Sequence, residues 1–192
     1  MAVIKNMDKE FLISLKRGDE RSFQRLYQIY ADKIYRFGYN FKRDEEFAEN
    51  LVQETFIKVF QNIKSFKDNK DLKNPLKSWI YKIAKNHAFN ELKKSRRELL
   101  VMTEEQSYEK IPINSSKKDI NEKVIQKEQL KRVYDQLDNL SFKKKTTFIL
   151  FFIEELTADE IAVIMKENRG STLKRLQRLK EELQQSLNKE EV

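Results

Sequence analysis

Glycine and proline are nearly absent from this chain, which has three glycines and two prolines in 192 residues. Proteins rich in β-structure use both residues in their many turns, so this scarcity argues against an all-β fold. Gly18, Gly38 and Gly170 also lie too far apart in the sequence to form a glycine-rich phosphate-binding loop. We therefore expect a chain built of helices.

Composition also excludes several kinds of chemistry. The chain has no cysteine, which rules out disulfide scaffolds, iron–sulfur ligation and thiol nucleophiles. Its single histidine, His87, cannot build the usual zinc or two-histidine iron site, and we interpret it as a packed or half-exposed helix residue. Carboxylate pairs such as Glu45-Glu46 and Glu154-Glu155 lie among other charges and are interpreted as solvated surface. We expect no catalytic residue, no metal site and no cofactor.

The excess of positive charge lies in the first half of the chain. Residues 1–97 hold 22 Lys and Arg against 13 Asp and Glu, a net charge of +9, whereas residues 98–125 carry −2 and residues 126–192 carry +1. A basic face of this kind suits an anionic partner such as nucleic acid. The longest apolar run, Phe148–Ile153, has six residues, far short of a membrane span. With no signal-type apolar core near the start, we expect a cytoplasmic protein without membrane insertion.

Apolar residues recur every three or four positions through most of residues 1–97, which predicts a first domain of four helices. A polar loop is expected between Ser65 and Lys77. Residues 98–123, with Pro112 and a polar Asn114-Ser115-Ser116 cluster, predict a flexible linker. Residues 124–192 then form a second helical domain. The expected fold class is all-α, with two small helical domains joined by a flexible linker.

The second domain contains a candidate helix-turn-helix at residues 157–187. Thr157 and Glu160 form a capping-box pattern that opens a short helix. Lys166–Gly170 is a polar turn, and five leucines spaced three or four apart form the apolar stripe of the next helix: Leu173, Leu176, Leu179, Leu183 and Leu187. The run Phe148–Ile153 could be a strand, but we interpret it as a buried helix because no partner strand is nearby.

Two basic helical faces are candidate nucleic-acid contacts. Residues 166–180 hold six Lys and Arg and one Glu, and the second helix is expected to expose Thr172, Lys174, Arg175 and Arg178. A basic entry suits a recognition helix, which enters the major groove between two phosphate backbones. After Trp79, a second stripe with one aromatic member consists of Lys82, Lys85, Phe89, Lys93 and Arg96. Ordinary solvated helix faces, with Phe89 simply buried, explain both patterns as well.

Residues 48–56 read A-E-N-L-V-Q-E-T-F and strongly resemble a helix of the bacterial extracytoplasmic-function sigma factors, which docks on the β′ clamp of RNA polymerase. Five further segments resemble the same family in the same order: Gly18–Phe23, Trp79–Asn86, Asn90–Arg97, Leu156–Ala162 and Gly170–Arg178. The resemblance covers about residues 8–97 and 124–187. This colinearity is more specific than any single motif.

The resemblance implies that the first domain (1–97) is sigma region 2, which binds polymerase and melts the −10 promoter element. The second (124–192) would be region 4, which reads the −35 element and docks on the β flap. The implied polymerase-binding residues are Glu49, Asn50, Gln53 and Glu54. The implied DNA-binding residues are Lys67, Lys82, Lys85, Asn86, Phe89, Asn90, Lys93, Arg96, Arg97, Arg169, Ser171, Thr172, Lys174, Arg175 and Arg178. The partners would be core RNA polymerase and promoter DNA, and members of the family often have an anti-sigma factor as well.

Two positions depart from the family pattern. Asn50 stands where an acidic residue is common, so one contact to the clamp is expected to be weaker. Lys166–Arg169 replaces the usual glycine, small apolar and proline positions of the turn, which leaves few apolar anchors for the recognition helix. Two rival functions stay open: a helix-turn-helix regulator that acts without polymerase, and a protein-interaction bundle that would need neither basic stripe.

Overall fold

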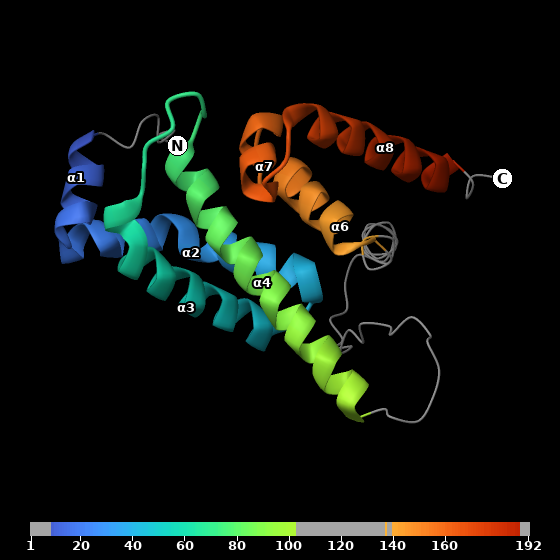
Figure 1. The fold of residues 1–192 in the computed structure, drawn as a ribbon, viewed down its shortest axis with the longest axis horizontal. Helices are drawn as coiled ribbons and strands as arrows, with labels where there is room; N and C mark the ends of the chain where they lie inside the picture. Colours follow the sequence, from blue (N-terminus) through green and yellow to red (C-terminus); the bar gives the residue numbers. More distant parts are fainter. Residues whose placement is uncertain (1–8, 103–136, 138–139, 189–192) are drawn as a thin grey trace, which may run out of the picture.

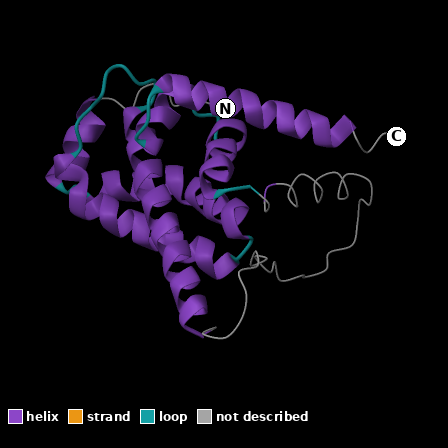
Figure 2. Ribbon diagram, turned by 45° about the vertical axis from the view of Figure 1, so that its right-hand side comes forward, coloured by secondary structure: helices purple, strands orange, loops and turns teal. Residues whose placement is uncertain are grey.

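The computed structural model describes residues 9–102, 137 and 140–188, and the regular structure within these residues is entirely helical (Figures 1 and 2). The all-α prediction is therefore confirmed. The helices of the first group are α1 (Lys9–Arg17), α2 (Glu20–Lys42), α3 (Glu45–Asn62) and α4 (Pro75–Met102), as predicted for this half of the chain. The second group comprises α6 (Phe142–Phe148), α7 (Ala158–Met165) and α8 (Arg169–Asn188).

Local capping signals set where the first long helices begin. The Asp19 carboxylate accepts a hydrogen bond from the backbone N–H of Ser22, and Asp44 does the same for Phe47, at 2.8 and 3.0 Å. Each carboxylate satisfies an N–H that the helix leaves unpaired and also opposes the positive end of the helix dipole. Short polar breaks therefore separate α1, α2 and α3.

Helices α2 and α3 pack closely around an apolar core. A Cβ placed on Gly38 would lie 2.9 Å from Leu51 Cδ2 and 3.0 Å from Ala48 Cα, so only glycine allows this approach. The core residues beneath are fully or almost fully buried: Leu26, Ile34, Phe37, Leu51, Val59 and Ile80. The 3-10 turn η1 (Ile63–Ser65) ends this layer before the loop that leads to α4.

Helix α4 continues to Met102, five residues beyond the predicted end of the first domain at residue 97. Residues 103–136 and 138–139, which include the remainder of the predicted linker and the start of the predicted second domain, lie outside the described residues. No helix in the described part of the chain has both the length and the apolar character of a membrane span.

The apolar run Phe148–Ile153 is helical, as interpreted from the sequence. It forms the last residue of α6 and a π-helical turn, η2 (Ile149–Ile153). Only part of it is buried: Ile149 and Leu150 are fully enclosed, whereas Phe151 and Phe152 are 36% and 45% exposed. The expectation of a fully buried segment is therefore wrong for those two rings.

Helices α7 and α8 form the predicted helix-turn-helix. Thr157 and Glu160 make both hydrogen bonds of a capping box at the start of α7. The helix ends at Lys166, whose backbone is left-handed with φ 55°. Because α8 already begins at Arg169, the turn is shorter than the Lys166–Gly170 segment expected from the sequence.

The second group of helices lies against the first, and α4 forms the contact between them. Helix α4 packs against α3 on one side and α7 on the other, as Figure 1 shows. The ring of Phe142, on α6, lies 4.8 Å from that of Phe41 on α2 and 5.1 Å from that of Phe89 on α4. The apolar core is therefore continuous between the two groups.

Candidate protein and nucleic-acid interfaces

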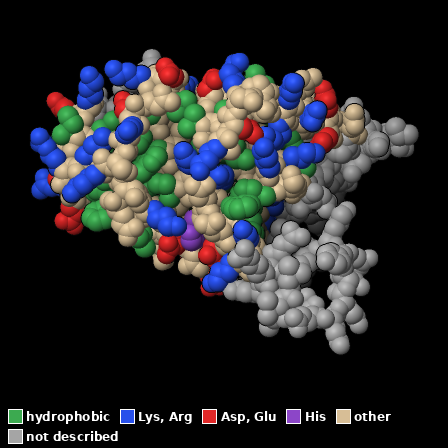
Figure 3. All heavy atoms as spheres, in the orientation of Figure 1, with side chains coloured by type: hydrophobic (Ala, Val, Ile, Leu, Met, Phe, Trp, Pro, Cys, Tyr) green, Lys and Arg blue, Asp and Glu red, His purple; other side chains and the backbone are tan. Residues whose placement is uncertain are grey.

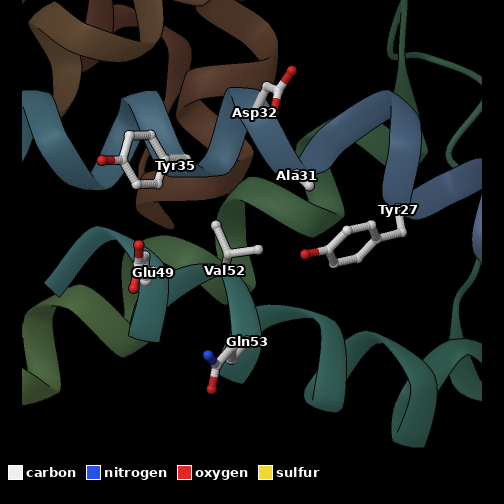
Figure 4. Close-up of a pocket in the computed structure, with 7 residues that line it drawn as sticks. All are labelled: Tyr27, Ala31, Asp32, Tyr35, Glu49, Val52 and Gln53. Atoms are coloured by element: carbon white, nitrogen blue, oxygen red, sulfur yellow. The ribbon is translucent and has the colours of Figure 1, made fainter. Parts of the chain in front are cut away.

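The predicted polymerase-binding residues lie beside a shallow hollow between α2 and α3, of about 210 Å³ (Figure 4). Glu49 and Gln53 form its α3 side, where Val52 lies between the two tyrosines of α2, Tyr27 and Tyr35. Asn50 is exposed and Glu54 half-buried on the same helix. The hollow thus combines an apolar floor with exposed polar and acidic groups, as in many protein-binding surfaces.

An aromatic groove that the sequence did not predict adjoins this hollow. It has a volume of about 720 Å³, and its walls are aromatic pairs across the helices, Phe23 with Phe60 and Tyr27 with Phe56. Phe60 is 61% exposed and Ile57 49% exposed. Phe60 follows the three-to-four spacing of apolar residues in α3 yet stays largely exposed, because α2 covers only part of that face.

The basic stripe of α4 is partly covered by the second group of helices. Asn86, Asn90 and Lys93 are exposed, whereas Lys82 and Lys85 are half-buried. Burial lowers the pKa of Lys85, and the neighbouring charges of Lys166 on α7 and of Lys82 lower it further. The two basic clusters predicted from sequence therefore lie close to one another.

Phe89 is 47% exposed, so the interpretation that it is simply buried is wrong. One side of its ring meets Phe142 in an edge contact, and the rest faces solvent. Lys67 is exposed in the loop before α4. Arg96 and Arg97 continue α4, and their side chains lie outside the described part. His87 is half-buried on the same helix, as expected.

A buried carboxylate joins α4 to the second group of helices. Glu154 was interpreted as solvated surface, which is wrong: the residue is 5% exposed and accepts a hydrogen bond from the Tyr81 hydroxyl. Burial raises the pKa of this carboxyl, although the Tyr81 bond and nearby cations oppose the rise. The Lys77 ammonium donates to the Glu154 backbone carbonyl at 2.5 Å, and the Asn74 backbone N–H donates to Glu160 at 2.8 Å.

The recognition helix presents a different set of residues from the one expected. Thr172 is fully buried and the Arg175 side chain is 12% exposed, so the expectation that α8 exposes them is wrong. Leu173, predicted within the apolar stripe, is 41% exposed, whereas Leu176 and Leu179 are buried as predicted. The other predicted DNA-contacting residues of this region are exposed: Arg169, Ser171, Lys174 and Arg178.

Positive side chains occur along the whole described face that Figure 3 shows. In the view of Figure 3, Lys and Arg side chains are interspersed with apolar ones across the face formed by both helix groups. Where the apolar side chain is an exposed aromatic, as at Phe89, such a mixture suits single-stranded nucleic acid. Among the described residues, the side chains of histidine, cysteine, aspartate and glutamate form no cluster that could hold a metal ion.

The chain is similar to known proteins along most of its length. The sigma-70 region 2 family matches residues 26–98, which include most of α2, all of α3 and most of α4. The ECF RNA polymerase sigma factor SigW of Bacillus subtilis is 28% identical over 185 residues, spanning 94% of this chain and 97% of SigW. The prediction of an extracytoplasmic-function sigma factor is confirmed by these similarities.

A second relative and a solved structure agree with this assignment. RNA polymerase sigma factor SigV of Bacillus subtilis is 29% identical over 161 residues, which cover 83% of this sigma factor and 87% of SigV. The sigma factor RpoE of Bartonella quintana, solved in complex with the anti-sigma factor NepR, superposes with a TM-score of 0.64. That match covers 88% of this sigma factor and 98% of RpoE at 22% identity, and it shows the shared fold.

The helix-turn-helix of this sigma factor lies outside the region 2 match but inside the aligned length of SigW. Charged side chains hold the turn between α7 and α8 in place. The Glu167 carboxylate accepts two hydrogen bonds from the Arg175 guanidinium, at 2.6 and 2.5 Å, and one from the Thr172 hydroxyl at 2.7 Å. These hydrogen bonds, with the ammonium of Lys143, lower the pKa of Glu167 to about 2 against the opposing effect of burial.

Proposed function

We propose that this sigma factor joins core RNA polymerase, directs it to specific promoters and helps to melt their −10 element. The observation that carries the proposal is the match to SigW along nearly the whole of both chains. The matched part of the chain contains a helical surface suited to a protein partner and a helix-turn-helix suited to DNA. The chain would act as a stoichiometric subunit rather than as a catalyst, in the cytoplasm with the polymerase and without a cofactor.

Each predicted domain has its own proposed role. Residues 1–97 act as region 2, residues 98–123 as a flexible linker and residues 124–192 as region 4. The region 2 family match at 26–98 supports the first boundary, although the α4 backbone stays helical to Met102. Region 4 would read the −35 element through α8 and dock on the β flap.

The β′ clamp is the proposed partner of the α2–α3 hollow. Glu49, Asn50, Gln53 and Glu54 supply the polar contacts, and the apolar floor supplies area to bury. An anti-sigma factor is a further proposed partner, since the related RpoE was solved bound to one. Such a partner would compete with polymerase wherever the two surfaces overlap.

Promoter melting is assigned to the α4 stripe and the loop before it. Exposed Asn86, Asn90 and Lys93 lie close to Phe89 along α4, and Lys67 is exposed in the preceding loop. The exposed part of the Phe89 ring offers a stacking surface for an unpaired base. Extruding a base costs a few kcal/mol of stacking energy, which such contacts offset. Arg96 and Arg97 would extend the positive stripe along the duplex.

The decisive experiment adds the purified chain to core polymerase and maps new transcription start sites on DNA of the source genome. We expect specific start sites that core polymerase alone does not use. Failure to create any start site would contradict the proposal. Tight operator binding by the free chain, with no effect on polymerase, would favour a helix-turn-helix regulator instead.

A variant of the hollow tests the clamp assignment. We expect Glu49→Lys to weaken association with core polymerase by about tenfold, because it places a positive charge where an acidic contact is proposed. Glu10→Lys, at an exposed position on α1, is the matched control and should bind normally. Equal binding by both variants would remove Glu49 from the interface.

A further inference from the structure

The turn of the helix-turn-helix lacks the apolar anchor that usually holds two such helices together. Lys166 ends α7 in a left-handed conformation, and the next residue, Glu167, turns its carboxylate inward, where the side chain is only 10% exposed. A carboxylate in such a position needs partners, because burial of an unpaired charge is strongly unfavourable. The partners present determine what this turn does.

Three side chains from two helices converge on Glu167. The Arg175 guanidinium binds both carboxylate oxygens, as a fork-to-fork pair, and also donates to the Thr147 hydroxyl on α6 at 3.0 Å. Thr172 donates its hydroxyl to the same carboxylate, and the Lys143 ammonium lies 2.9 Å from it. The network therefore ties the turn, α6 and α8 together.

This network decides which side of α8 faces outward. At 100° per residue, Thr172, Leu176 and Leu179 lie on the inner side, with Arg175 at its edge. Glu167 draws Arg175 inward, which leaves Lys174 and Gln177 at the centre of the outer side, flanked by Leu173 and Arg178, with Ser171 beyond Arg178. An outer side containing leucine and glutamine can offer an apolar contact to a thymine methyl group and paired hydrogen bonds to adenine.

We propose that the Glu167–Arg175 ion pair fixes the position of the recognition helix, as an apolar turn does in other helix-turn-helix units. Arg175 is then a positioning residue. The residues that read the −35 element are Leu173, Lys174 and Gln177. This inference rests on the proposed function. Its alternative is that Arg175 leaves Glu167 and contacts a DNA phosphate directly. The proposal and its alternative predict different DNA binding when Glu167 and Arg175 are replaced by uncharged side chains.

The test uses holoenzyme reconstituted from core polymerase and each full-length variant. Its affinity is measured for a mapped promoter with an intact or a scrambled −35 element, over a range of salt concentrations. Arg175→Ala alone leaves the Glu167 carboxylate without its main partner. We expect this variant to lose the preference for the intact element by about tenfold, and to melt at a lower temperature.

The informative variant replaces both charges, as Glu167→Leu with Arg175→Met. Buried ion pairs can be exchanged for apolar side chains of similar size without loss of stability. Thr172 can then donate its hydroxyl to the Asn168 carbonyl four residues earlier, and exposed Lys143 returns to water. We expect this variant to keep both the −35 preference and the salt dependence of the original chain.

Arg178→Ala is the matched control, because Arg178 is exposed on the outer side of the same helix. A lost phosphate contact reduces the slope of log affinity against log salt by about 0.9, and we expect that change for Arg178→Ala. If the apolar variant has a normal melting temperature but loses the −35 preference with the same drop in slope, Arg175 is a DNA ligand and the inference is wrong.

Two further results remain interpretable. Should the apolar variant fail to fold, the exchange Glu167→Arg with Arg175→Glu keeps an ion pair in place, and the same two outcomes apply: retained preference supports positioning, lost preference with a smaller slope refutes it. If holoenzyme with the original chain shows no promoter preference at all, the proposed function itself has failed.

Discussion

At the scale of single residues, buried charge has the largest consequences in this molecule. Glu154 and Glu167 are both removed from water, yet their surroundings act on them in opposite directions. Glu167 meets a guanidinium and an ammonium, so its pKa falls to about 2. Glu154 meets a phenol and its Oε1 is buried without a hydrogen-bond partner, so burial raises its pKa although the phenol and nearby cations oppose the rise.

The raised pKa of Glu154 predicts a particular dependence of stability on pH. The folded chain holds this proton more tightly than the unfolded chain, so the stabilising contribution is complete below the ordinary value of 4.5. That contribution is lost as the pH rises through the higher folded-state pKa. We expect Glu154→Gln, which cannot ionise, to gain free energy of unfolding relative to the original chain as the pH rises above 4.5.

Urea unfolding at several pH values measures this difference directly. Glu155→Gln changes an exposed neighbour and is the matched control. Tyr81→Phe removes the hydroxyl that donates to Glu154 and should cost about 1–2 kcal/mol at neutral pH. A gap between Glu154→Gln and the original chain that stayed constant with pH would show that Glu154 does not titrate in this range.

At the scale of elements, the separation of α2 and α3 depends on one glycine. Gly38 lies where the backbones approach most closely, and the neighbouring α3 atoms that a Cβ would meet include the Ala48 Cα, which cannot move aside easily. This pair of helices also forms the hollow and the aromatic groove. A change in their spacing should therefore alter both stability and the proposed clamp surface.

We expect Gly38→Ala to lower the free energy of unfolding by about 1–3 kcal/mol, because the added methyl group overpacks the contact. Gly170→Ala is the control: its nearest neighbour would be the Asn168 side-chain oxygen at 3.4 Å, and alanine favours a helix more than glycine does. Thermal unfolding followed by circular dichroism compares the two. Similar melting temperatures for both variants would mean that α2 and α3 have room to separate.

At the scale of the whole molecule, the second helix group covers part of the α4 stripe. Phe142 lies against Phe89, and Lys166 lies near Lys85, on the face proposed to bind the −10 element. Elements named −10 and −35 are about 25 base pairs apart, or roughly 85 Å at 3.4 Å per base pair. If the two groups bind the two elements as proposed, we expect them to separate on promoter DNA.

Weakening this packing should therefore help the free chain to bind DNA. We expect Phe142→Ala to remove about 1.4 kcal/mol from the contact and to raise the affinity of the free chain for promoter DNA by up to about tenfold. Phe152→Ala removes a ring that is 45% exposed on the adjoining turn and serves as the control. Unchanged affinity for Phe142→Ala would show that the contact does not limit DNA binding.

The sequence by itself determined the helical class, the starts of the helices and the order of the motifs. These features depend on partners three or four residues apart, such as Asp19 with Ser22 and Thr157 with Glu160, which the linear pattern shows directly. The family resemblance likewise followed from spacing and order along the chain, and the comparisons confirmed it.

Only the tertiary structure decided the burial and the contacts of four side chains: Glu154, Glu167, Phe60 and Phe142. Tyr81 and Glu154 are 73 residues apart, and Asn74 and Glu160 are 86 apart, so composition and periodicity give no sign of either contact. Arg175 is only eight residues from Glu167, yet the sequence predicted an exposed cationic side chain on an amphipathic helix. A charged side chain is assigned to the surface by default because burial without a partner is costly, and the partner becomes visible only when the helices are packed.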